Sequence, residues 1–71
     1  MSTYDVIVYG HDGTSVASVT FSKSDDETNW YDAVHEADDL AYLHRGLAVK
    51  VYRDNREDEY ELVYEAYEEE R

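Results

Sequence analysis

The segment from Asp25 to His44 constrains the fold more than any other, because its apolar residues follow the period of one helix. They recur at i, i+3 and i+4, the spacing that places side chains on one face of an α-helix. These residues are Trp30, Ala33, Val34, Ala37, Leu40, Ala41 and His44. Ser24 and Glu27 predict a capping box at the start, and Gly46 predicts a left-handed stop. The sequence therefore predicts one amphipathic helix in the middle of the chain, with Trp30 as its core anchor.

Segments of β-branched and aromatic residues flank this helix and predict four strands. The predicted strands are residues 3–9, 14–21, 47–54 and 59–67. Gly10-His11-Asp12-Gly13 joins the first two, and Asp-Gly is a strong hairpin signal. Residues 55–58 form the turn between the last two. In the last strand the even positions form an apolar set that we expect to face the core: Tyr60, Leu62, Tyr64 and Ala66.

These elements give the order ββαββ, which indicates an α+β fold. We expect an antiparallel-rich, four-stranded sheet with one helix packed on one face. Residues 1–71 are expected to form a single domain, with 68–71 as a frayed tail.

The charge of the chain is strongly one-signed. Among 71 residues, 18 are Asp or Glu and 6 are Lys or Arg, for a formal net charge of −12. Such a surface repels nucleic acid and acidic lipid headgroups, so direct binding to DNA, RNA or membranes is not expected. The absence of cysteine excludes disulfides and thiolate metal sites. No signal peptide or apolar run of about 20 residues is evident, which favours a cytoplasmic location.

Carboxylates are expected to form two rows. On the helix, four of them fall within a band of about 60° on the side away from the apolar stripe. These are Asp25, Asp32, Glu36 and Asp39. On the last strand, four carboxylates stand at odd-numbered positions and are expected to point to one side of the sheet. These are Glu57, Glu59, Glu61 and Glu65. Lys50 and Arg53 of the preceding strand are expected to offset part of their mutual repulsion. All eight are predicted to bind a partner, because like charges at such spacing cost stability.

Metal and catalytic motifs are incomplete. His35 and Asp39 lie one helical turn apart, but they are not the H-E-x-x-H motif and no third ligand is apparent. Residues 54–65 have the length of a calcium loop, yet Arg56 stands at its third position and Glu59 where glycine is needed. No nucleophile elbow is present. The sequence predicts no cofactor, no metal and no catalytic residue, and therefore a protein that is not an enzyme.

Several apolar side chains stand at strand positions that are expected to point away from the core. They are Ile7, Tyr9, Tyr52, Val63 and Tyr67. If all of them line the uncovered side of the sheet, they form an amphipathic patch suited to a partner or to self-association. Single exposed tyrosines on a sheet are equally ordinary, so both interpretations stay open.

Size, one-signed charge and the rows Asp32-Glu36-Asp39 and Glu57-Glu59-Glu61-Glu65 resemble the small acidic inhibitors encoded by phages and mobile elements. These include anti-restriction and anti-CRISPR proteins that act as DNA mimics. The resemblance implies a non-enzymatic inhibitor that occupies the DNA-binding channel of an immune effector, with a CRISPR surveillance complex as first candidate. It implies a monomer or weak homodimer whose partner is a basic protein surface inside the host cell.

Two other hypotheses explain the same charge. The chain could be a small domain of a halophile, whose carboxylates serve solubility and spread evenly over the surface. It could also be an acidic partner that neutralises one basic protein. The arrangement of the carboxylates in rows favours an acidic face that meets a partner over an even spread of charge on the surface.

Overall fold

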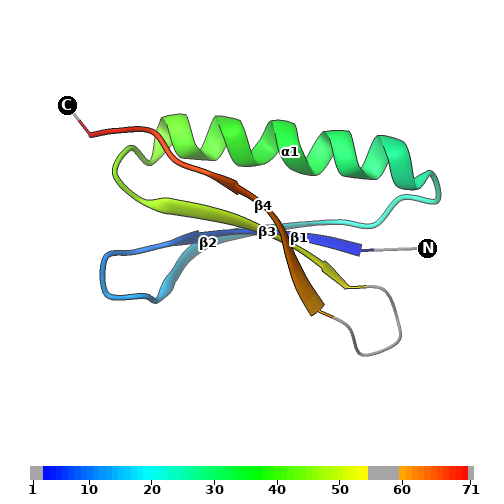
Figure 1. Ribbon diagram of the computed structural model, residues 1–71, viewed down its shortest axis with the longest axis horizontal. Coiled ribbons are helices and arrows are strands. Elements are labelled where there is room, and N and C mark those ends of the chain that lie inside the picture. The colour runs from blue at the N-terminus through cyan, green and yellow to red at the C-terminus, as the bar shows by residue number, and fades with distance from the viewer. Residues whose placement is uncertain (1–2, 55–59, 71) are drawn as a thin grey trace.

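The computed structural model describes residues 3–54 and 60–70. The elements are β1 (Thr3–Tyr9), β2 (Ser15–Phe21), α1 (Asp26–Leu43), β3 (Ala48–Asp54) and β4 (Tyr60–Ala66). The α+β class and the ββαββ order expected from the sequence are confirmed (Figure 1). The turn expected at 55–58 lies outside the described residues.

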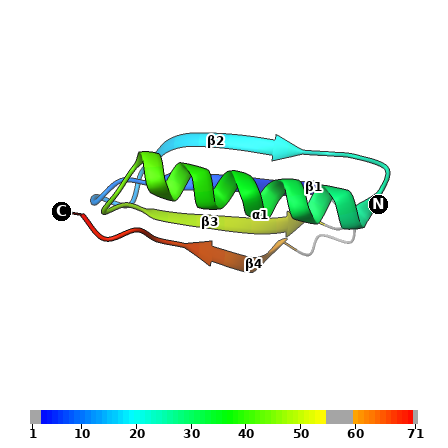
Figure 2. The ribbon, with the colours of Figure 1, turned by 90° about the horizontal axis from the view of Figure 1, so that it is seen from above.

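The strands form one four-stranded sheet in the order β2-β1-β3-β4. Every neighbouring pair is antiparallel, so β1 and β3 are the central strands and β2 and β4 the outer ones. Helix α1 runs along one side of this sheet, above the two central strands (Figure 2). The other side of the sheet is uncovered in the described part of the chain (Figure 1).

The first hairpin turns at the predicted Asp-Gly step. The backbone N–H of Gly10 donates to the Thr14 carbonyl at 2.7 Å, and that of Gly13 donates to the Gly10 carbonyl at 3.0 Å. Gly13 has a φ of 85°, a value that glycine adopts without steric cost. The turn therefore sets the pairing of β1 with β2.

The core lies between α1 and the central strands. Valines at alternate positions of β1 and β3 meet alanines of the helix, and all of these side chains are buried: Val6, Val8, Val49, Val51, Ala33, Ala37 and Ala41. Small alanine side chains let the helix approach the sheet closely, so the valines are fully covered. Trp30 packs at the edge of this core and meets Tyr4 and Tyr64 edge-on, with ring centroids 5.7 and 6.2 Å apart. The expected core-facing side is confirmed for Ala33, Ala37 and Ala41, which are buried, and for Trp30 and Leu40, which pack partly buried against the core. Asn29, which the prediction did not include, is also fully buried on this side.

The helix begins one residue later than the predicted capping box requires. Asp25 is the N-cap, with extended backbone angles, and its carboxylate accepts from the Glu27 backbone N–H at 3.2 Å. The Thr28 hydroxyl donates to the same carboxylate at 2.7 Å. The predicted Ser24–Glu27 box is wrong, because aspartate caps as well as serine and Thr28 supplies a second hydrogen bond. At the other end α1 stops at Leu43, with His44 as its C-cap. Gly46 has the predicted left-handed φ, at 89°, but it lies in the turn beyond the helix, where its backbone N–H donates to the Glu68 carbonyl at 2.9 Å.

An irregular register divides β4 into two halves. Val51 pairs with Tyr64, but the next residue, Tyr52, pairs with Leu62, so that Val63 is an extra residue in the strand. Such a bulge reverses which side of the sheet the following side chains face. Tyr64 and Ala66 therefore face α1, whereas Tyr60 and Leu62 lie on the uncovered side, 51% and 45% exposed. The prediction that all four form one core-facing set is wrong.

Candidate acidic interface on α1

From Asp25 to Leu43, every formally charged side chain is a carboxylate. They are Asp25, Asp26, Glu27, Asp32, Glu36, Asp38 and Asp39. Two are half-buried at the margin of the helix, Asp32 and Glu36, and the others are exposed. The core-facing side of α1 is uncharged, with Asn29 as its one buried polar residue among those described, so the helix separates an uncharged side from an acidic one.

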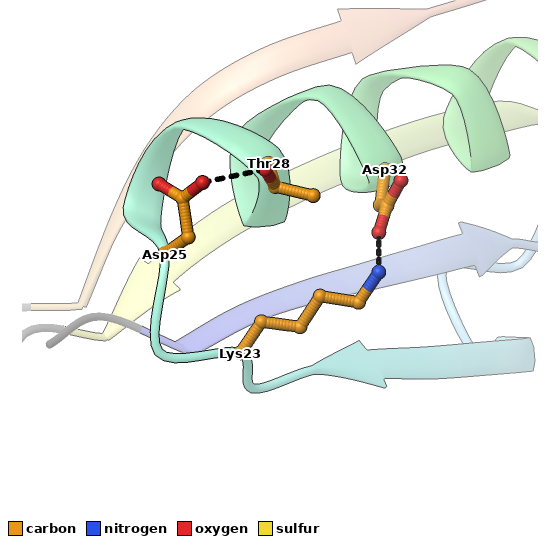
Figure 3. A network of polar contacts seen from close by, with 4 residues as sticks. All are labelled: Lys23, Asp25, Thr28 and Asp32. Atoms are coloured by element: carbon orange, nitrogen blue, oxygen red, sulfur yellow. Dashed lines mark hydrogen bonds and ion pairs between the residues drawn. The ribbon is translucent and has the colours of Figure 1, made fainter.

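On α1, two of the predicted partner-binding residues have contacts within the fold (Figure 3). The carboxylate of Asp25 caps the helix, and the hydrogen bond from the Thr28 hydroxyl lowers its pKa below the ordinary value. Asp32 forms an ion pair with Lys23, which follows β2. Its side chain is 33% exposed. Asp25 is therefore a structural cap, and Asp32 marks the side of the helix that lies toward β2.

Glu36 and Asp39 continue from Asp32 along the same side of α1. Residues at i, i+4 and i+7 of an α-helix lie one above another. We call Asp32, Glu36 and Asp39 the α1 acidic row. The described residues place one basic group at this row, Lys23 at the Asp32 end. The predicted helix row is thus present, shortened by the use of Asp25 as a cap.

Asp38 was not among the predicted residues, because it lies on the opposite flank of the helix from the α1 acidic row. Its carboxylate accepts from the Tyr64 hydroxyl of β4 at 2.8 Å. This hydrogen bond, together with burial, raises the pKa of Tyr64. The helical period places Asp38 toward β4, but only the tertiary structure reveals its tyrosine partner.

The predicted row on the last strand is divided. Glu57 and Glu59 lie outside the described residues. Glu61 pairs across from Arg53 and forms an ion pair with it, and Glu65 lies 3.9 Å from the Lys50 ammonium group. Because of the bulge at Val63, Glu61 and Glu65 point to opposite sides of the sheet. The expectation that they share one side is wrong, and each faces a basic residue of β3.

Tyrosines gather on the uncovered side of the sheet. The rings of Tyr52 and Tyr60 stack at a centroid distance of 5.0 Å and an interplanar angle of 10°. The Tyr9 hydroxyl donates to that of Tyr52 at 3.3 Å, and the Tyr60 hydroxyl donates to Asp5 at 2.9 Å. Burial and this bond to Asp5 raise the pKa of Tyr60 to about 12. We call Tyr9, Tyr52 and Tyr60 the tyrosine cluster.

The tyrosine cluster differs in membership from the patch considered for this side. Tyr9 and Tyr52 belong to it as anticipated, and Ile7 shares their side through its pairing with Lys50. Val63 packs against the core instead, because it is the extra residue of the bulge. Tyr60 takes the place of Val63 on the uncovered side, because the bulge turns Tyr60 to that side. The hydroxyl groups are bonded to each other and to Asp5, so the cluster also contributes to the fold.

No group of three or more His, Asp or Glu side chains that could hold a metal ion exists within residues 3–54 and 60–70. An open depression of about 450 Å³ lies near the C-terminal end, lined by Arg45, Tyr67, Glu68 and Glu69. It holds no nucleophile paired with a base. In the same described ranges, no helix has the length and apolar character that crossing a membrane would need.

Comparisons with protein-family models, with curated proteins and with solved structures found no match to this chain.

Proposed function

We propose that the chain is a non-enzymatic binding protein whose α1 surface occupies a basic, DNA-binding surface of another protein. The observation that carries the proposal is the charge of α1, where every formally charged side chain is acidic. The partner would present Arg and Lys side chains to the α1 acidic row. An immune effector that binds DNA, such as a CRISPR surveillance complex, is the first target to test.

The linear charge density of α1 supports competition with DNA. Fourteen helical steps separate Asp25 from Asp39, which corresponds to about 21 Å of helix axis. The seven carboxylates over this length give about one charge per 3 Å, close to the ~3.4 Å spacing of charges along one strand of B-DNA. A basic channel that surrounds α1 would therefore meet a similar density of negative charge. A flat surface that faces only the α1 acidic row would meet fewer charges, because Asp38 lies on the opposite flank and Asp25 caps the helix.

The uneven distribution of charge supports a directed interface over general solubility. Strand β2 contains no Asp, Glu, Lys or Arg, whereas all the formally charged residues of α1 are acidic. On β4, Glu61 and Glu65 face basic residues of β3, while Glu36 and Asp39 on α1 extend a row whose ion pair is at Asp32. A halophile's solubility surface would spread carboxylates over all elements alike, so the proposal favours a partner.

Capture and competition test the proposal. The immobilised chain is exposed to a bacterial lysate, and the retained protein is then challenged with duplex DNA at increasing KCl. We expect duplex DNA to displace the retained protein, and we expect retention to fall steeply with salt, because steering between opposite charges is screened. A retained protein that DNA does not displace would instead support the neutralising-partner hypothesis. Unfolding of the chain in dilute buffer with recovery in molar KCl would support the halophile hypothesis.

A further inference from the structure

Strand β2 is the one long stretch of this acidic chain that carries no charge. Residues 13–22 contain no Asp, Glu, Lys, Arg or Pro, although the chain has a net charge of −12. β2 is an outer strand that pairs with β1 on one side. Ser15, Val16, Ser18 and Thr20 are exposed, with Val16 at 53%. Natural outer strands are usually protected from pairing by charged residues or proline, and β2 has neither.

The other outer strand has the protection that β2 lacks. β4 carries Glu61 and Glu65 and is bent by the bulge at Val63. β2 has one irregularity, at Val16, close to its first residue, and its run from Ala17 to Phe21 pairs with β1 without interruption. The backbone of β2 on the side away from β1 is therefore suited to accept another strand.

We infer that β2 pairs antiparallel with β2 of a second copy, so that two four-stranded sheets form one continuous sheet. A second copy fits because its own β2 is also uncharged, so the two strands meet without opposing carboxylates. The stretch is bounded by Asp12 at one end and Lys23 at the other. Antiparallel pairing of two identical strands brings each Lys23 end to the Asp12 end of the other copy.

The alternation of β2 also agrees with this pairing. About a two-fold axis at Ser18, Ala17 of each copy lies opposite Val19 of the other. Both residues face α1 in their own sheet, since they pair with Val8 and Val6 of β1. The two helices then lie on the same side of the joined sheet, and each copy adds its α1 acidic row to that side.

Charge repulsion sets the salt dependence of this dimer. Each helix lies above β1 and β3, so the two helix axes are four strand spacings apart, about 19 Å. That separation exceeds the ~8 Å screening length of physiological salt and falls below the ~30 Å length of dilute buffer. The acidic layers therefore oppose pairing at low salt and cease to do so as salt rises. This response is opposite to the one expected for binding a basic partner, and the dimer does not depend on the proposed function.

Sedimentation equilibrium of the full chain, at protein concentrations up to about millimolar, tests the dimer in dilute, physiological and molar KCl. We expect the association constant to rise at least tenfold from dilute to molar KCl. Amide hydrogen exchange should slow in residues 15–21 as the dimer forms. A chain that stays monomeric under all these conditions would overturn the inference and leave the proposed function untouched.

Two lysine substitutions locate the interface. Ser18→Lys places like charges opposite each other at the two-fold axis, so we expect at least tenfold weaker association despite the lower net charge. Leu62→Lys makes the same change of charge on β4, where Leu62 is 45% exposed, and should dimerise like the unchanged chain. Val16→Lys serves in place of Ser18→Lys if circular dichroism shows that the latter is unfolded. Dimerisation of the β2 variants at the original strength, or loss of the dimer in Leu62→Lys, would contradict the inference.

Discussion

Helix α1 and strand β4 are both rich in carboxylates, yet they hold them in different ways. On α1, Asp32, Glu36 and Asp39 share one side of the helix, with Lys23 as a basic neighbour at one end. On β4, Glu61 and Glu65 point to opposite sides, and each lies across from a basic residue of β3. The helix therefore gathers its carboxylates on one side with its ion pair at Asp32, whereas the strand divides its carboxylates between the two sides of the sheet, each beside a basic residue.

The difference arises because the helix and the strand fix the direction of their side chains in different ways. Each turn of a helix is set by hydrogen bonds four residues apart, so the side on which a residue lies follows from its position alone. The alternation of a strand depends on its partner, and one extra residue reverses it. Val63 is that residue in β4.

The largest expected effect concerns the two halves of β4. Tyr64→Ala should lower the free energy of unfolding by about 3 kcal/mol, because it removes a ring packed between the sheet and Trp30. Leu62→Ala should lower it by about 0.5 kcal/mol or less, because Leu62 lies on the exposed side. Urea unfolding followed by circular dichroism measures both. Equal losses would show that Leu62 and Tyr64 face the same core and that the bulge is absent.

The next prediction compares carboxylates of α1 with carboxylates of β4, using two double variants that each remove two negative charges. Glu36→Gln/Asp39→Asn should weaken competition with DNA for the captured partner roughly 30-fold, at about 1 kcal/mol per lost contact. Glu61→Gln/Glu65→Gln removes the same charge from β4 and should weaken it less than about threefold, because these groups already face Arg53 and Lys50. The measurement is the protein concentration that displaces half of a labelled duplex.

Equal weakening by the two double variants would mean that net charge, rather than the α1 acidic row, determines binding. Stability provides the control for this pair. Removing like charges from α1 should leave the urea midpoint unchanged or slightly higher, because each repulsive pair costs a few tenths of a kcal/mol.

A smaller effect on stability is expected at Asp25, the carboxylate that caps α1. Asp25→Ala should destabilise the chain by about 1 kcal/mol, because the Glu27 N–H and the Thr28 hydroxyl lose their acceptor. Ser24→Ala should change the stability by at most a few tenths of a kcal/mol. Thermal melts of both variants compare the two positions. A larger loss for Ser24→Ala would restore the capping box predicted from the sequence.

The smallest effect appears at alkaline pH. The pKa of Tyr60 is raised from 10.0 to about 12, so folding favours the protonated phenol. Its contribution to stability is fully present below pH 10 and is lost as pH rises toward 12. Absorbance titration of the phenolates should show one late-titrating tyrosine, which disappears in Tyr60→Phe. Titration of Tyr60 at its ordinary value would contradict its placement against Asp5.

Local signals account for the part of the candidate site that could be predicted. Asp32, Glu36 and Asp39 were found because the helical period alone puts them on one side. Asp38 was not chosen, because its contact with Tyr64 joins residues 26 positions apart. The tyrosine cluster was anticipated in part, since the parity of Tyr9 and Tyr52 is correct and that of Tyr60 is reversed by the bulge.

The sequence by itself determined the element order, the amphipathic helix, the left-handed glycine after it and the Asp-Gly hairpin, because each depends on neighbours within a few residues. Only the tertiary structure decided which side of β4 faces α1, which carboxylates pair with bases, and that uncharged β2 is an outer strand. Those features depend on pairing between distant segments, where one extra residue such as Val63 changes the side that every later residue faces.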